Sequence, residues 1–132
     1  MRVDISQYFN EARLAGALAY LDTGSGNASI EIYGNTAPSA GAPAGDDPLV
    51  TVALSKPAGT ISNGLLTLTA ADVSGELVMH TGTASWARFK NGAGSWVMDC
   101  DVSVEGGNAA VQLPSLTLYA GGRCPLSTST LG

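Results

Sequence analysis

The chain has 132 residues, and Ala, Gly, Ser and Thr account for 60 of them, whereas Asp, Glu, Lys and Arg make up only 13%. This length is typical of one domain, and a hydrophobic fraction of 45% excludes a disordered chain. A net charge of -5 disfavours partners with phosphate backbones and anionic membrane surfaces, because like charges repel. We therefore expect one folded unit that binds neither nucleic acid nor membrane and whose surface is rich in small, uncharged residues.

One amphipathic helix is predicted over residues 6–21, where Leu14, Leu18 and Leu21 fall on a single face. Asp4 is placed to cap its start, and glycines at 24 and 26 mark its end. The longest apolar stretch, 14–21, is far shorter than the roughly 20 residues needed to span a bilayer. A signal peptide needs a basic start and a small-residue cleavage site, whereas Asp4 and Glu11 precede this stretch and Asp22 follows it, so we expect no Sec export. Residues 1–26 are interpreted as an N-terminal helical arm.

Short strands with a two-residue period are predicted over 28–34, 50–54 and 66–70. Between the first two strands, residues 35–48 carry three prolines and no period, which indicates a loop that crosses an end of the fold. The segment 56–59, Lys-Pro-Ala-Gly, is predicted to separate the second strand from the third.

The clearest hairpin signal lies between Gly82 and Val104, where Asn91-Gly92 and Gly94 interrupt two extended segments. Strict alternation along the second segment predicts that one of its faces is core, formed by Trp96, Met98, Cys100, Val102 and Val104. Further short strands surround a break at Pro114. Residues 27–120 are expected to form the folded unit, and 121–132 a C-terminal tail that frays or lies on a partner.

These elements predict a mainly β protein, specifically an antiparallel β-sandwich of jelly-roll type with one short N-terminal helix. The predicted core consists of Ile30, Ile32, Val52, Leu54, Leu66, Leu68, Phe89, Met98, Cys100, Val102, Val111 and Leu118.

No catalytic, metal or cofactor site is predicted, and we expect a protein that is not an enzyme. His80 is the sole histidine, which excludes metal sites that need two imidazoles. Asp99 and Asp101 share a strand face and are interpreted as solvated, with a cation-binding or catalytic carboxylate pair as the alternative. Two cysteines, Cys100 and Cys124, are too few for a disulfide framework, and whether they bridge is left open.

A candidate interface follows from the alternation in the first segment of the hairpin. If Ala87 and Phe89 are core, then Trp86, Arg88 and Lys90 project outward, a combination common at interaction hot spots. The alternative is that Trp86 packs in the core of the second sheet or under the helix, with Arg88 extending its head group to solvent. The candidate interface residues are Trp86, Arg88, Lys90, Tyr33, Tyr119 and Arg123.

Four patches of the chain resemble a group of small virion proteins of tailed bacteriophages. They are DTGSG at 22–26, SIEIYG at 29–34 with Pro38 after it, LVTVALS at 49–55, and GTASWARF at 82–89 with VMD at 97–99. The resemblance covers roughly residues 7–120. It implies a β-sandwich structural protein, a capsid cement or decoration protein, that lies on the outside of the virion shell. The family pattern has no catalytic residues to transfer.

The expected partners are therefore the major capsid protein and copies of the same chain, as a homo-oligomer on the particle, after synthesis in the host cytoplasm. One alternative is a tail or neck component of the particle, which the same composition allows. Another is a carbohydrate-binding module that uses Trp86, Tyr33 and Tyr119 as stacking platforms.

Overall fold

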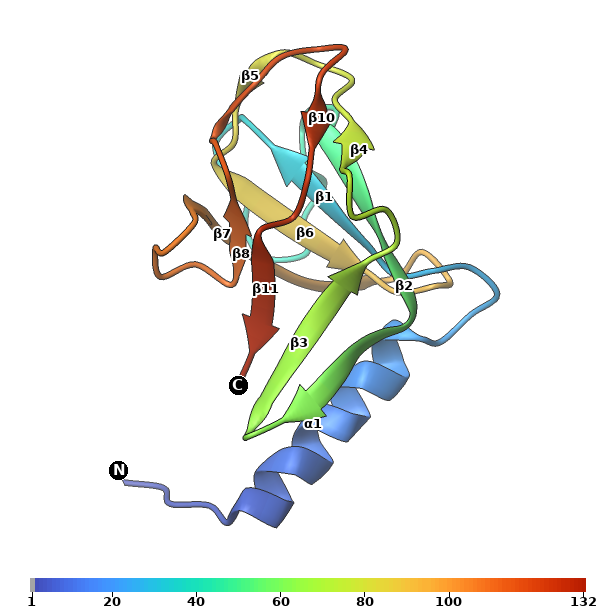
Figure 1. The fold of residues 1–132 in the computed structure, drawn as a ribbon, viewed down its shortest axis with the longest axis vertical. Helices are drawn as coiled ribbons and strands as arrows, with labels where there is room; N and C mark the ends of the chain where they lie inside the picture. Colours follow the sequence, from blue (N-terminus) through green and yellow to red (C-terminus); the bar gives the residue numbers. More distant parts are fainter. Residues whose placement is uncertain (1) are drawn as a thin grey trace.

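The computed structural model describes residues 2–132, which form a mainly β fold with one short helix (Figure 1). The elements in chain order are α1 (Gln7–Leu21), β1 (Ser29–Tyr33), β2 (Val50–Ser62), β3 (Leu65–Ala70), β4 (Glu76–Leu77), β5 (Gly82–Thr83), β6 (Trp86–Lys90), β7 (Trp96–Val104), β8 (Val111–Leu113), β9 (Thr117–Leu118), β10 (Arg123–Cys124) and β11 (Thr128–Leu131).

Seven of the strands close into a barrel in the order β1-β2-β3-β11-β8-β7-β6. The expectation of two facing sheets is therefore corrected, because β11 pairs with β3 on one side and with β8 on the other and so joins the strands into a ring. The expectation of purely antiparallel pairing also fails at one place. Strands β7 and β8 run parallel, with Val102 opposite Val111.

Two small ribbons, β4 with β10 and β5 with β9, lie at one end of the barrel, and α1 lies at the other end (Figure 1). Helix α1 packs on β2 and β3 through Leu14 and Leu21, which are 5% and 1% exposed. No helix among residues 2–132 has both the length and the apolar character needed to cross a membrane. The molecule thus has two distinct ends, each built from a different part of the chain.

The start of α1 differs from the prediction by its cap. Ser6 is the N-cap, and its hydroxyl accepts a hydrogen bond from the backbone N–H of Phe9 at 3.1 Å. Asp4 lies too early in the chain for this role and instead forms an exposed ion pair with Arg2 at 2.8 Å. The end is as expected, because the helix stops at Leu21 and Gly24 has a positive φ of 105°.

Strand β2 runs without a break through the segment that was predicted to be a turn. Its pairing with β3 shifts register between Leu54 and Gly59, so the Lys-Pro-Ala-Gly sequence is an irregularity inside one long strand. The chain turns later, at Asn63-Gly64, where φ is 53° and 76°. An Asn-Gly pair supplies the positive φ angles that a tight turn requires.

The predicted core is confirmed at nine of its twelve positions, which are at most 5% exposed: Ile30, Ile32, Val52, Leu54, Leu66, Leu68, Phe89, Val111 and Leu118. The other three, Met98, Cys100 and Val102, lie on β7 and are half-buried. At the ends of this strand, Trp96 and Val104 are 44% and 48% exposed, so the prediction of a fully buried face is wrong. The register gives the reason: β6 pairs only with residues 96–101 and β8 only with 102–104, so each part of β7 has a neighbour on one side alone. A register shift after Phe89 also places Trp96 opposite Lys90, on the outer face of the barrel.

The segment 121–132 contains two paired strands, which corrects the expectation of a fraying tail: β11 is part of the barrel wall and β10 belongs to the ribbon at its end. Cys124 on β10 is 2% exposed and Ser129 on β11 is fully buried. The polar sequence Thr-Ser-Thr gives no apolar alternation from which β11 could be predicted. The inward side chain of this strand is a serine, where a large apolar residue is usual.

The predicted hairpin is confirmed between β6 and β7. Asn91 is 4% exposed, and its side-chain oxygen accepts hydrogen bonds from the backbone N–H groups of Ala93 and Ser95. The side chain therefore completes the turn that the Asn-Gly sequence predicts.

Candidate interface

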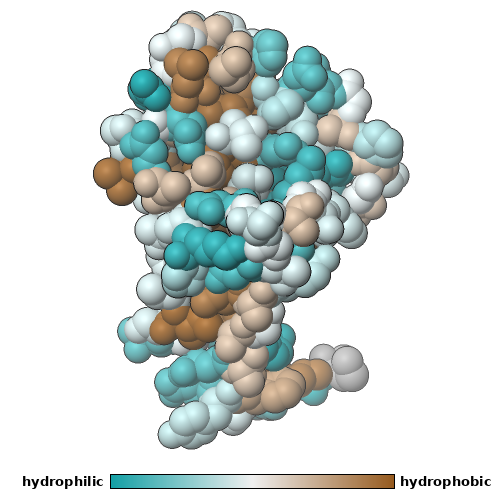
Figure 2. All heavy atoms as spheres, turned by 90° about the vertical axis from the view of Figure 1, so that its right-hand side faces the viewer, coloured by the Kyte–Doolittle hydropathy of each residue, from teal (hydrophilic) through white to brown (hydrophobic). Residues whose placement is uncertain are grey.

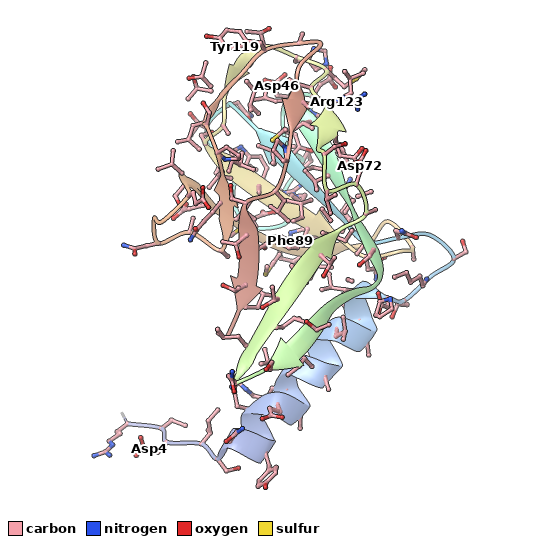
Figure 3. All side chains as sticks on the ribbon, viewed as in Figure 1. Asp4, Asp46, Asp72, Phe89, Tyr119 and Arg123 are labelled. Carbon is pink, nitrogen blue, oxygen red and sulfur yellow. The ribbon has the colours of Figure 1, made fainter. Side chains whose placement is uncertain are left out.

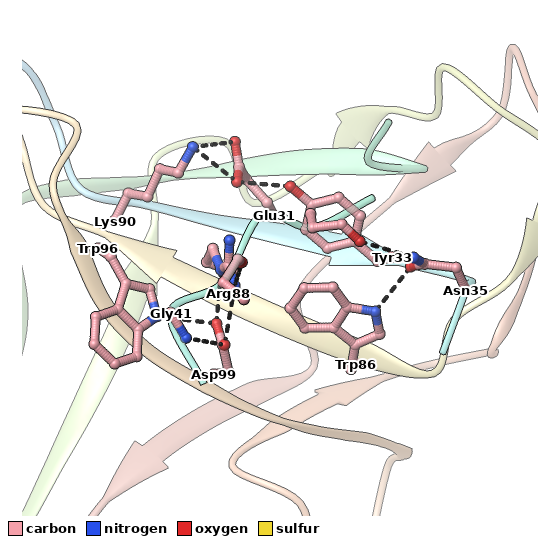
Figure 4. Close-up of polar contacts among 11 residues, drawn as sticks. Glu31, Tyr33, Asn35, Gly41, Trp86, Arg88, Lys90, Trp96 and Asp99 are labelled. Carbon is pink, nitrogen blue, oxygen red and sulfur yellow. Dashed lines mark hydrogen bonds and ion pairs between the residues drawn. The ribbon is translucent and has the colours of Figure 1, made fainter. Parts of the chain in front are cut away.

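Four of the six candidate interface residues lie together on the outside of the barrel, on the neighbouring strands β1 and β6 (Figure 4). Tyr33 is the register partner of Trp86, and Arg88 and Lys90 follow along β6. The alternation of the sequence thus placed these side chains on the correct face. It did not predict what covers them.

The 35–48 loop lies over this face, so the expected exposure is wrong. Trp86, Tyr33 and Arg88 are 2%, 4% and 7% exposed. The alternative was right that Trp86 is buried, but the 35–48 loop covers it in place of a second sheet or the helix, and the Arg88 head group does not reach solvent. The Nη2 of Arg88 donates to the carbonyl of Ala42 at 2.6 Å, which ties the loop to the strand.

An ion pair forms the centre of this cluster. The Arg88 guanidinium donates to both oxygens of Asp99, from Nε at 2.8 Å and from Nη2 at 3.1 Å. The same carboxylate accepts from the backbone N–H of Gly41 at 3.2 Å and from the Trp96 indole at 3.1 Å. Asp99 therefore has four hydrogen bonds, one of which comes from the loop.

The aromatic rings complete the cluster. Tyr33 and Trp86 stack with centroids 4.5 Å apart and planes 14° apart, and the Arg88 guanidinium carbon lies 5.3 Å from the Trp86 ring centre. The Trp86 indole donates to the side chain of Asn35 at 2.9 Å. The Tyr33 hydroxyl donates to Glu31, which also pairs with Lys90 at 3.1 Å.

Each cation of the cluster is paired with a carboxylate, Arg88 with Asp99 and Lys90 with Glu31. Hydrogen bonds from Arg88 lower the pKa of Asp99 below its usual value, and the same bonds raise the pKa of Arg88. Burial, together with the hydrogen bond to Glu31, raises the pKa of Tyr33 to about 12. These groups hold the 35–48 loop on the barrel. The loop covers Trp86 and Tyr33, two of the three stacking platforms in the carbohydrate interpretation, so a sugar ring has no access to them.

The residues considered for chemistry do not come together. Asp99 is in the ion pair and Asp101 is exposed. Among residues 2–132, no three or more His, Cys, Asp or Glu side chains gather in a way that could hold a metal ion. Cys100 and Cys124 are both free thiols, and burial raises the pKa of each to about 11.

The remaining two candidates, Tyr119 and Arg123, lie at the end of the barrel opposite α1 (Figure 3). Both line a hollow of about 140 Å³ between Pro114 and Pro125. Its floor is apolar and is formed by Val78, Leu118 and Cys124, which are at most 5% exposed.

Two exposed apolar residues continue this surface along β4. Leu77 is the register partner of Arg123, and the exposed Met79 follows two residues later, while Val78 between them points inward. Leu77, Met79 and Tyr119 are 46%, 61% and 66% exposed. We call Leu77, Met79, Tyr119 and Arg123 the barrel-end surface. Figure 2 shows hydrophobic residues gathered at this end of the molecule.

The sequence interpretation missed Leu77 and Met79. The signal that could have found them is the alternation in Glu-Leu-Val-Met at 76–79, which predicts a short strand with one outward apolar pair. Arg123 was recognised, but only the pairing of β4 with β10 places it next to Leu77.

No protein-family model, curated protein or solved structure significantly matches this chain.

Proposed function

We propose that this protein is a structural component of a tailed-bacteriophage particle, a capsid cement or decoration protein that binds the major capsid protein through the barrel-end surface. The observation that carries the proposal is the exposure of Met79 and Tyr119, at 61% and 66%, beside an apolar hollow. The sequence resemblance supplies the class of particle.

The composition of the barrel-end surface supports binding to another protein. Aromatic residues, Met and Arg are enriched where proteins bind each other, whereas Lys, Glu and Asp are depleted. Tyr119 and Arg123 flank the hollow, and a side chain of the capsid protein that fills it would reach an apolar floor. Burial of apolar area contributes roughly 25 cal/mol per Å².

The barrel supports a role in stabilising a shell. A ligand that binds only the assembled state stabilises that state by mass action, and many copies act together through multivalency. The closed barrel offers a rigid body for this purpose, because its seven strands form a continuous hydrogen-bonded ring. A rigid partner loses little conformational entropy on binding.

The test uses particles of the phage that encodes the protein, grown without it and then incubated with purified protein. Wild-type protein is expected to bind the shell and raise its resistance to heat. The variant Met79→Ser/Tyr119→Ser is expected to lose occupancy by at least tenfold while retaining its own melting temperature. The control variant Val73→Ser removes an exposed apolar residue, 85% accessible, outside the defined surface and is expected to bind normally.

Electron microscopy of the same particles locates the protein. Density on the outer capsid surface is expected. Density confined to the tail or neck would overturn the capsid assignment in favour of that alternative station. Equal heat resistance of complete and deficient particles would overturn the stabilising role.

A further inference from the structure

Helix α1 has a second apolar face, which is exposed in the structure of residues 2–132. Its inner face packs on the barrel through Leu14 and Leu21. The outer face has no charged residue and consists of Tyr8, Phe9, Ala12, Ala15, Gly16 and Ala19, all exposed. A helix that is apolar on both sides is typically buried on both sides. Figure 1 shows α1 at the margin of the fold, with no element on its outer side.

Gly16 indicates that something approaches this face. It lies inside the helix, where glycine costs about 1 kcal/mol relative to alanine. A Cβ atom added at this position would meet no atom within 4 Å, so no contact within the chain requires the glycine. A close contact with another molecule would explain it.

The small residues form one hole of the kind found in paired helices. Such a hole is lined by residues i, i+3, i+4 and i+7 of one helix and receives a side chain of the facing helix. In α1 these positions are all small: Ala12, Ala15, Gly16 and Ala19. The same face carries a large side chain for such a hole, since Tyr8 is 87% exposed one turn before Ala12.

We propose that α1 pairs with α1 of a second copy of this chain, antiparallel, about a two-fold axis close to Ala12. In this arrangement Tyr8 of each copy enters the hole of the other copy. Tyr8 lies four residues before the axis at Ala12, and the centre of the hole, between Ala15 and Gly16, lies about four residues after it. An isologous interface requires this self-complementarity. A parallel pair would instead place Tyr8 against Tyr8 and leave both holes empty.

The area of the face fits a reversible dimer. Tyr8 and Phe9, at 87% and 56% exposed, offer roughly 300 Å² together. With Ile5 and the alanines, each copy offers roughly 500 Å², so a pair buries about 1,000 Å², near the lower limit for a specific interface. Glu11 and Arg13, the two charged residues of α1, lie on its flanks about 100° from the centre of the face. The pairing therefore buries no charge.

Sedimentation velocity over a concentration series of the full chain tests the proposal. The wild-type protein is expected to pass from monomer to dimer. Gly16→Leu fills the hole without a clash inside the chain and is expected to be monomeric at every concentration, with an unchanged fold by circular dichroism. Tyr8→Ala is expected to weaken the dimer at least tenfold. The matched control Tyr119→Ala, at the other end of the molecule, is expected to dimerise normally.

Disulfide cross-linking tests the antiparallel direction. Ala12→Cys lies beside its own copy at the axis and is expected to cross-link on oxidation, whereas wild-type protein is not. Ala19→Cys is expected to stay uncross-linked, because two such residues lie about 21 Å apart along an antiparallel pair. A wild-type monomer at all concentrations, a dimeric Gly16→Leu variant or efficient cross-linking through Ala19→Cys would each overturn the proposal. These results do not depend on where in a particle the protein acts.

Discussion

Arg88 and Asp99 are register partners on β6 and β7, and their ion pair also fastens the 35–48 loop to the outside of the barrel. The Arg88 guanidinium donates a hydrogen bond to the carbonyl of Ala42, and the Asp99 carboxylate accepts one from the backbone N–H of Gly41. One cross-strand pair therefore fixes the position of a loop that has no regular secondary structure of its own.

Asp99→Asn is expected to destabilise the protein by about 3 kcal/mol at pH 7, because it leaves the buried guanidinium without its counter-charge. Thermal melting measures the loss, and hydrogen exchange should show faster exchange within the 35–48 loop. The control Asp4→Asn breaks the exposed pair with Arg2, whose side chains are 74% and 87% accessible, and should leave the melting temperature unchanged. Equal effects of the two substitutions would contradict a clamping role for Asp99.

The same pair predicts a loss of stability in acid. The pKa of Asp99 is lower in the folded protein than in the unfolded chain, where it is about 3.9. The stabilisation is therefore complete above about pH 4 and is lost as the pH falls through the folded-state pKa. Denaturant unfolding at pH 2 to 7 should show the difference between wild-type protein and Asp99→Asn shrinking below pH 4. A constant difference would contradict the prediction.

Tyr33 predicts a loss of stability in alkali. Its pKa of about 12 exceeds that of an unfolded tyrosine, about 10. Ionisation therefore favours the unfolded chain, and stability should fall as the pH rises from 10 to 12. Tyr33→Phe should reduce this fall, whereas Tyr8→Phe, at an exposed position, should not. Unfolding by urea, followed by fluorescence at each pH, provides the comparison.

Strand β11 predicts opposite effects for two changes near the C-terminus. Deletion of 128–132 removes the strand that joins β3 to β8 and should abolish cooperative unfolding. Ser129→Ala should stabilise the protein by about 1 kcal/mol, because the buried Ser129 hydroxyl has no hydrogen-bond partner among residues 2–132. A folded deletion variant would show that the barrel closes without β11.

Two glycines predict opposite effects of the same substitution. Gly59 lies at the register shift of β2, where an added Cβ would collide with the backbone carbonyl of Thr67. Gly59→Ala should therefore lower the melting temperature strongly. Gly16→Ala meets open space and should raise it, by about 0.5–1 kcal/mol of stability, through helix propensity. Calorimetry of both variants at low protein concentration checks the pair.

The inward faces of α1 and of several strands follow from the sequence alone. The four-residue spacing of Leu14 and Leu18 determines which face of α1 meets the barrel, and the alternation around Ile30, Val52 and Phe89 determines which side chains point into it. These features depend on residues a few positions apart, so a periodic pattern is enough to predict them. The Asn-Gly pair in the β6–β7 hairpin belongs to the same class.

The tertiary structure decided the closure of the barrel and the burial of Trp86. Closure of the barrel depends on the pairing of Thr130 with Thr67, which is far away in the chain. Strand β11 has no apolar alternation from which this pairing could be predicted. Alternation places Trp86 and Arg88 on one face of β6, but only the 35–48 loop decides whether water reaches that face. The physical reason is that a local period determines which side chains share a face, whereas the partner of that face is set by contacts between distant segments.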